Sequence, residues 1–418
     1  MRIDLIHQAY EIAKDRYATL GVDTEMVLNQ LQDFHLSLHC WQADDLVGFE
    51  PTTHEISGGI QRTGNYMGRA RNIDELRQDI EKAKSLIPGN HRLNLHAIYG
   101  DFKGQKVDRN EINYGHFLSW MQWSKEHHMP LDFNCTNFSH PKSGSLTLSN
   151  PNNEIRAFWT EHVRRCRKIA NTLGECQHDP CVMNLWIHDG VKDLTVNRLL
   201  YRQMLEESLD QIYKEKYPWV KDSIEAKLFG IGLETMTVGS YDFYVTYAVK
   251  HQKVLTLDLS QFHPTEQVAD KISALMMHVP ELMIHLSRAV RWASDHVPLM
   301  DDNMLEVFQE IIRSSAIHRV RYALDYFDPS INRVGAYVIG SRAAQKCMLR
   351  ALLEPTSLIH GYELAGQGFQ KLALLEECKS LPWNAVYDEF CLRNDMPVGS
   401  EIIPEIEQYE RKVLSKRL

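Results

Sequence analysis

Two apolar runs of the chain each carry one polar residue of a type that binds metals. The run at 254–259 reads VLTLDL and contains Asp258, and the run at 282–286 reads LMIHL and contains His285. Apolar runs of this length are typical of parallel strands that are buried on both faces. A carboxylate and an imidazole in such strands are unfavourable unless a partner compensates them. A bound divalent cation would do so, and a buried hydrogen bond to the backbone or to an arginine is the alternative.

The segment between the two runs has the pattern of a helix. Apolar residues recur at helical spacing over Pro264–His278. A strand, a crossover helix and a second strand form the repeating unit of a parallel sheet. The stretch Val254–His296 therefore predicts one such unit, with a possible metal ligand on each of its strands.

The same alternation recurs along most of the chain. Further strands are expected at His35–Trp41, His91–Tyr99, Leu131–Thr136, Cys181–Asp189, Ser223–Gly232 and Arg319–Phe327. Helices are expected at Leu5–Leu20, Ile73–Leu86, 110–128, 152–173, Arg198–Glu215 and Met304–Ser315. About eight strands that alternate with helices predict an α/β protein with a (β/α)8 barrel, the TIM barrel. A doubly wound open sheet is the alternative, and it is disfavoured because no GxGxxG turn follows an early strand.

The C-terminal part of the chain differs from the rest. Residues 336–418 show helical periodicity and no clear strand, with helices expected at Ala343–Leu353, Phe369–Ser380 and Glu405–Leu418. We therefore predict a catalytic barrel with an N-terminal helix over residues 1–335 and an α-helical extension over residues 336–418. A long glycine-containing segment, Gln42–Arg69, follows the first strand, and loops of this length usually act as lids or contact arms or else are disordered.

Composition narrows the class of protein. The net charge of -9 does not suggest a nucleic-acid binder, and no apolar run approaches the roughly 20 residues of a membrane span. The first residues, MRIDLIHQAYEIAK, are mixed in charge and do not resemble a signal peptide. The 8 cysteines include no CxxC pair. These features predict a reduced cytoplasmic protein.

Four residues that can bind a metal stand at matching positions on the last strands of the predicted barrel. In this fold the active site lies at the C-terminal ends of the strands. From the fifth to the eighth strand these positions carry Glu225, Asp258, His285 and Asp325. Three carboxylates and one imidazole suit Mn²⁺, Mg²⁺ or Co²⁺ better than a metal that prefers thiolates. Unrelated ion pairs at the strand ends are the alternative. His96, Trp186 and Lys227 would lie at the same mouth.

Long motifs then connect the chain with a known family. They are, in order, HCWQADD at 39–45, GGIQRTGNY at 58–66, LIPG at 86–89, RLNLHAIY at 92–99, AKLFGIG at 226–232, FHPTE at 262–266 and EECKSLPW at 376–383. With these motifs the chain resembles bacterial L-rhamnose isomerase over nearly its full length. The resemblance implies a (β/α)8 barrel in a homotetramer, two divalent metals that are typically Mn²⁺, and interconversion of L-rhamnose and L-rhamnulose.

The resemblance also implies a role for the residues at the mouth. The structural metal of the family is held at the positions of Glu225, Asp258, His285 and Asp325. Lys227 matches an active-site lysine, and His96 and Trp186 fall where the family contacts the sugar. We expect Asp325, with a bound water, to handle protons and His96 to help the sugar ring open.

The sequence departs from the family at the second, catalytic metal. The family has a histidine three residues after the position of Asp258, and here that place is Gln261. The family motif W-D-S-D-H is WASDH at 292–296, so Ala293 replaces the first acid and Asp295 remains, as a metal or substrate ligand. Ala289 also stands where the family has proline. Because Gln261 offers only a neutral amide oxygen, we expect one tight Mn²⁺ site and a second site that is weak or absent.

Two functions fit these residues. The first is a metal-dependent aldose–ketose isomerase for L-rhamnose or a related sugar, in which a divalent metal polarises the sugar oxygens O1 and O2. The second is a non-catalytic or weakly active sugar-binding relative that keeps only the structural metal. Lys227, His96, Trp186 and Asp295 favour the enzyme, whereas Gln261 and Ala293 favour the relative.

Overall fold

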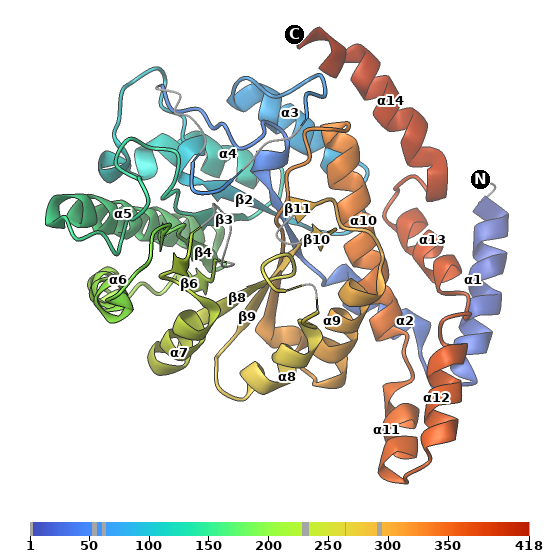
Figure 1. The fold of residues 1–418 in the computed structure, drawn as a ribbon. Coiled ribbons are helices and arrows are strands. Elements are labelled where there is room, and N and C mark those ends of the chain that lie inside the picture. Colours follow the sequence, from blue (N-terminus) through green and yellow to red (C-terminus); the bar gives the residue numbers. More distant parts are fainter. Residues whose placement is uncertain are drawn as a thin grey trace.

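The centre of the molecule is a closed barrel of parallel strands. The computed structural model describes residues 3–51, 57–60, 64–227, 234–263, 265–290 and 295–417. The barrel strands follow one another in the order β1-β12-β9-β8-β6-β4-β3-β2 (Figure 1). Their bounds are β1 Leu36–His39, β2 Arg92–His96, β3 Leu131–Asn134, β4 Cys181–Trp186, β6 Val220–Glu225, β8 Val254–Asp258, β9 Leu282–Leu286 and β12 Val320–Leu324. The predicted (β/α)8 barrel is confirmed.

Every expected barrel strand is present, but most are shorter than the apolar run that predicted them. The expected strand Ser223–Gly232 differs most, because β6 begins at Val220 and ends at Glu225. The last part of that expected strand, at 228–232, lies outside the described residues. Two small antiparallel pairs stand beside the barrel: β5 Gly190–Val191 pairs with β7 Met236–Thr237, and β10 Arg288–Ala289 pairs with β11 Asp295–His296.

Helices surround the barrel on its outside (Figure 1). Those up to β12 are α1 Ile3–Ala18, α2 Thr24–Gln32, α3 Ile73–Lys84, α4 Leu118–Glu126, α5 Asn153–Gln177, α6 Arg198–Tyr213, α7 Tyr241–His251, α8 Ala269–Met276 and α9 Asp302–Arg313. The sequence analysis missed α2 and α7. It also began α8 too early, because residues 265–268 are described and precede the helix, while the predicted first residue, Pro264, lies outside the described residues. The backbone of Glu266 instead donates to His263 O at 2.8 Å, so a turn precedes the helix.

On β4, β8, β9 and β12 the inside of the barrel changes from apolar to polar toward the strand ends. Val182, Val254, Met283 and Ala323 form a separate apolar cluster. Alternate residues of a strand share a face, so the next inward positions on β4, β8 and β9 are Asn184, Thr256 and His285. On these strands the polar mouth therefore lies above an apolar layer, whereas β2 and β3 carry the ion pair of Arg92 and Asp132 near their N-terminal ends.

The C-terminal region is helical, as predicted. Its helices are α10 Arg333–Leu352, α11 Thr356–Leu364, α12 Gly368–Glu377, α13 Trp383–Arg393 and α14 Ile402–Lys412. The sequence analysis missed α11 and α13 and began α10 too late, at Ala343. Helix α10 starts where the Asn332 side chain caps it by accepting from Gly335 N at 2.8 Å. It packs against α2, α3 and α9, and α13 packs against α1.

The predicted boundary between residues 335 and 336 falls inside α10. The division into two parts stays a prediction. Helices α11 and α12 form a hairpin that projects from the body of the molecule (Figure 1). Among the described helices, none combines the length and apolar character that a membrane crossing requires.

Candidate metal centre

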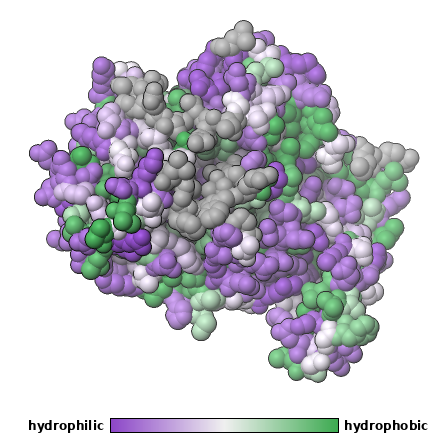
Figure 2. All heavy atoms as spheres, in the orientation of Figure 1, coloured by the Kyte–Doolittle hydropathy of each residue, from purple (hydrophilic) through white to green (hydrophobic). Residues whose placement is uncertain are grey.

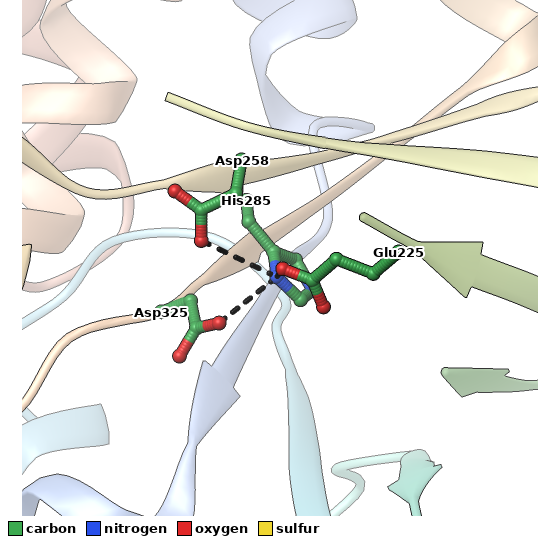
Figure 3. Close-up of side chains that lie close together, drawn as sticks. All are labelled: Glu225, Asp258, His285 and Asp325. Atoms are coloured by element: carbon green, nitrogen blue, oxygen red, sulfur yellow. Dashed lines mark hydrogen bonds and ion pairs between the residues drawn. The ribbon is translucent and has the colours of Figure 1, made fainter. Parts of the chain in front are cut away.

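Four predicted ligands meet at the C-terminal mouth of the barrel. Glu225 ends β6, Asp258 ends β8, His285 lies in β9 and Asp325 follows β12. Figure 3 shows their side chains pointing toward one another. One ligand atom of each lies within 4.8 Å of those of the other three. His285 Nδ1 lies 3.0 Å from Asp325 Oδ2, 3.2 Å from Glu225 Oε1 and 3.8 Å from Asp258 Oδ2.

The strand register explains how residues far apart in sequence meet. Asp258 pairs with His285 across β8 and β9, and His285 pairs with Ala323 of β12. Since Asp325 is two residues after Ala323, it shares the inward face of that strand. The four side chains therefore meet because parallel strands end together.

Hydrogen bonds from neighbouring residues orient two of the carboxylates. Asp258 Oδ1 accepts from Ser260 N at 2.7 Å, from Ser260 Oγ at 2.8 Å and from Ser287 Oγ at 2.8 Å. Glu225 Oε2 accepts from Asn184 Nδ2 at 2.6 Å. Each acid thus uses one oxygen on the surrounding protein while its other oxygen faces His285. Supporting hydrogen bonds of this kind are typical of metal ligands.

The electrostatics of the four residues favour a bound cation. Burial disfavours the charged form of His285, but the carboxylates of Glu225 and Asp325 outweigh burial and raise the pKa of its imidazole well above the usual value. Burial alone would raise the pKa of Asp325, but the charge and hydrogen bond of His285 lower it. Three carboxylates balanced by one imidazolium leave an excess of negative charge. A divalent cation that replaces the proton on the imidazole nitrogen would fit this donor set of oxygens and one nitrogen.

Aromatic rings form the opposite side of the mouth, at the ends of β1 to β4. The ring of His96 lies 4.8 Å from that of Trp41 and 5.8 Å from that of Phe138, edge to face in both cases. Phe138 also meets Trp186 edge to face at 5.8 Å. His96 and Trp186, both predicted to contact the sugar, therefore belong to one continuous aromatic wall. That wall consists of Trp41, His96, Phe138 and Trp186.

His96 is held neutral in this wall. Burial lowers the pKa of its ring to about 3, against the opposing attraction of Asp325. Its Nδ1 lies 3.1 Å from Thr136 Oγ1. At neutral pH the ring is therefore uncharged, and each of its nitrogens can donate or accept a hydrogen bond.

The remaining predicted residues lie at different depths around the mouth. Lys227 is buried beyond the end of β6, and its Nζ lies 2.5 Å from Glu234 Oε1. Gln261 follows β8, and its backbone N–H donates to Asp258 O at 3.1 Å. Ala293 lies outside the described residues. Asp295 belongs to β11, where its backbone pairs with Ala289, and its side chain is not among those described.

Sequence reasoning missed the residues that support the ligands. Asn184 stands inside an otherwise apolar strand, so its polarity on the inward face was an available signal. Ser287 lies two residues after His285 and is therefore expected on the same face, which was a second available signal. Ser260 and Glu234 gave no such signal, because they lie in loops after the strands.

Comparison with known proteins agrees with this geometry. The family model described as L-rhamnose isomerase (RhaA) matches residues 4–417. An L-rhamnose isomerase of Bacteroides thetaiotaomicron is 64% identical over 414 residues, which cover 99% of each chain. One from Rhodopirellula baltica is 49% identical over 415 residues, which cover 99% of this chain and 97% of that one. Among solved structures, a D-tagatose 3-epimerase-like protein has a TM-score of 0.47 and 12% identity, over 69% of this chain and 95% of that chain.

Proposed function

The chain belongs to the L-rhamnose isomerase family, and we propose that it interconverts the aldose L-rhamnose and the ketose L-rhamnulose with the help of a divalent metal. The observation that carries this proposal is the convergence of Glu225, Asp258, His285 and Asp325 at the barrel mouth, opposite the aromatic wall. A sugar placed in the mouth would contact a charged side and an apolar side at once.

Mn²⁺ is the ion we propose for the four ligands. The set offers oxygen atoms and one imidazole nitrogen, without a thiolate, and manganese accepts such a set. When bound, a divalent ion supplies Lewis-acid stabilisation of the negative charge that develops on the sugar oxygens. The hydrogen bonds from Asn184, Ser260 and Ser287 hold Glu225 and Asp258 in place for it.

The side chains around the metal ligands would bind the sugar and move protons. The neutral ring of His96 can accept a hydrogen bond from a sugar hydroxyl and so help the ring form to open. Asp325, which is more exposed than the other three ligands, can handle a proton through a water. The face of Trp186 offers an apolar surface to the C–H groups of the sugar. Lys227 can donate to a sugar oxygen.

The chain departs from its family at the residues that hold the second metal. Gln261 and Ala293 remove an imidazole and a carboxylate from it, so we propose one tight ion per chain and a second that is weak or absent. The replacement of these two ligands also favours a second candidate function, a sugar-binding relative with weak or no turnover. The two candidates differ only in the rate of ketose formation.

We further propose a cytoplasmic homotetramer. Large apolar side chains are exposed on the hairpin of α11 and α12, namely Leu364, Phe369 and Leu372. Figure 2 shows apolar surface on this projecting part of the molecule. Exposed apolar surface of this kind marks contacts between proteins. Sedimentation at micromolar concentration should give a tetramer, and a monomer alone would refute the assembly.

The test of function is ketose formation from L-rhamnose. The protein is stripped with a chelator, reloaded with Mn²⁺ and assayed against the stripped sample. Metal-dependent formation of L-rhamnulose supports the isomerase. Binding of L-rhamnose without any ketose would instead support the sugar-binding relative.

A further inference from the structure

A buried ion pair stands beside the candidate metal centre and is not part of it. Lys227 follows Glu225 by two residues, just beyond the end of β6. Its Nζ lies 2.5 Å from Glu234 Oε1, and the two side chains are 3% and 6% exposed. Lys227 Nζ also donates to the backbone oxygen of His188 at 3.1 Å. Since His188 follows the end of the neighbouring strand β4, the pair lies at the same mouth as the metal ligands.

The small sheet of β5 and β7 fixes Glu234 in position. Thr235, the next residue, donates its backbone N–H to Val191 O at 2.9 Å, and Val238 N donates to Asp189 O at 3.0 Å. Gly190 lies against the Glu234 side chain so closely that an added Cβ would be 2.9 Å from Glu234 Cγ. A larger residue at position 190 would displace Glu234.

The segment that carries β5 is itself tightly held. The carboxylate of Asp189 accepts four hydrogen bonds, from N and Oγ1 of Thr147 and from N and Oγ of Ser149. His188 Nε2 lies 2.9 Å from Gly144 O. The oxygen atoms that face Lys227 therefore belong to a rigid frame, so the ammonium group has a fixed place.

Stability alone does not account for this pair. Removing two charges from water opposes folding, and a well-packed apolar pair is often as stable or more stable. Glu234 Oε1 receives no well-angled hydrogen bond from the described residues, so Lys227 is what balances its charge. Buried charges that persist at a mouth of this kind are characteristic of functional sites.

We propose that Glu234 is a positioning residue, which holds the ammonium group of Lys227 ready to donate to a sugar oxygen. An ammonium group has three N–H donors. Within the described part of the chain, the His188 carbonyl accepts a hydrogen bond from one of them, and Glu234 contacts the ammonium group as an ion pair. An N–H donor therefore remains for the substrate, and a donor fixed in advance needs no reorganisation during the reaction. The inference rests on the proposed function, because it assigns the sugar as the acceptor.

The test is a double-mutant cycle with Glu234→Gln, Lys227→Met and the double variant, all loaded with Mn²⁺. We expect Glu234→Gln to lower kcat by about 10- to 100-fold, the range for residues that orient active groups, with a much smaller change in KM. In the Lys227→Met background the same substitution should change kcat by less than about twofold, because it acts only through Lys227. Glu206→Gln, which breaks the exposed pair with Lys250, is the matched control and should leave kcat unchanged.

A structural role would give a different pattern. If Glu234→Gln lowers kcat by the same factor with and without Lys227, the positioning role is overturned. If Glu234→Gln alone does not fold, the double variant decides, because it leaves no unpaired buried charge. A folded double variant with the kcat of Lys227→Met supports the proposal, and an unfolded one makes the pair structural and overturns it.

Binding separates this inference from the proposed function. The acyclic polyol of L-rhamnose has the hydroxyl groups of the substrate but cannot turn over. Calorimetry should show polyol binding that is weaker for Glu234→Gln than for the parent by only a small factor, in line with the small change expected in KM, even if the parent forms no ketose. Unchanged binding to Glu234→Gln together with unchanged kcat would overturn the inference while leaving the isomerase proposal in place.

Discussion

On the β1–β4 side of the mouth, histidines lie among aromatic rings, whereas on the β6–β12 side one lies among carboxylates. His39 is fully buried beside Trp41 and Tyr326, and burial lowers the pKa of its ring to about 3, as it does for His96. His285 is equally buried, yet the carboxylates around it raise the pKa of its ring well above the usual value. His39 and His285 are equally buried, so their neighbours decide which of the two rings is charged.

This difference indicates which side of the mouth is formed without a ligand and which side requires a bound cation. The aromatic side is neutral and packed by ring contacts, so it is formed without a ligand. The carboxylate side gathers like charges that repel one another unless a cation is present. The first side would therefore supply shape to a sugar, and the second would supply a metal.

Removing one charge from the carboxylate side should have the largest effect. Asp258→Asn keeps an oxygen for Ser260 and Ser287 but removes a negative charge from the metal ligands. We expect loss of tight Mn²⁺ and a fall in kcat of about 1000-fold or more, since a metal supplies several kcal/mol of transition-state stabilisation. The measurements are metal content and ketose formation.

The control for this variant is Glu281→Gln, at the opposite end of the barrel. Glu281 Oε2 lies 3.1 Å from Arg321 Nε, away from the four ligands. Its kcat and metal content should match those of the parent. An Asp258→Asn protein that keeps its metal and more than about a tenth of the parent kcat would contradict the claim that the carboxylate side holds the metal.

Adding ligands to the same side should have the next largest effect, in the opposite direction. Gln261→His returns an imidazole and Ala293→Asp returns a carboxylate to the second metal. Each alone should do little, and the pair should raise kcat by about tenfold or more, because two ligands of one ion couple. The gain is expected in kcat more than in KM, since the charge develops in the transition state.

The measurement is kcat for L-rhamnose in saturating Mn²⁺ for the parent, both single variants and the double variant. A double variant that is no faster than the parent would show that the second site was not lost at Gln261 and Ala293. A parent that already matches the double variant would show that other residues complete that site.

The barrel could be predicted from the sequence because buried parallel strands appear in it as apolar runs. The sequence also identified Glu225, Asp258, His285 and Asp325. The C-terminal ends of barrel strands meet at one mouth, regardless of the segments that connect the strands in the sequence. Helix α7, Tyr241–His251, was missed because its aromatic and β-branched residues are weak helix formers. It is a helix because Tyr244, Tyr247 and Ala248 bury one face.

The supports of the site were harder to predict than its ligands. The contact between Lys227 and Glu234 depends on the pairing of β5 with β7, which are two residues long and leave no pattern in the sequence. The three hydrogen bonds to Asp258 Oδ1 depend on loop geometry after β8 and β9. Such contacts follow from tertiary structure and not from local periodicity.

A smaller effect is expected beneath the aromatic side, where His162 is held neutral. Thr136 N–H donates to its Nε2 at 3.1 Å, its Nδ1 lies 2.9 Å from Arg109 O, and burial lowers the pKa of the ring to about 3. An unfolded histidine has a pKa of about 6.5. Because the folded pKa is lower, the stabilisation is present above pH 6.5 and is lost as the pH falls toward the folded value.

Between pH 7.5 and pH 5 this group should remove about 2 kcal/mol from the free energy of unfolding. His162→Gln can keep both hydrogen bonds without titrating, so its unfolding free energy should fall less over that range. The exposed His278→Gln is the control and should keep the slope of the parent. Urea unfolding at the two pH values measures both, and equal slopes for the parent and His162→Gln would contradict the assignment.

The most direct test of the central claim is the metal content of the protein after Mn²⁺ loading and gel filtration. The four ligands should retain close to one tight ion per chain, because the second site lacks the imidazole and the carboxylate at positions 261 and 293. No retained ion would contradict the metal centre itself. Two tight ions per chain would contradict the single site and would mean that Gln261, His263 or His296 has become a ligand.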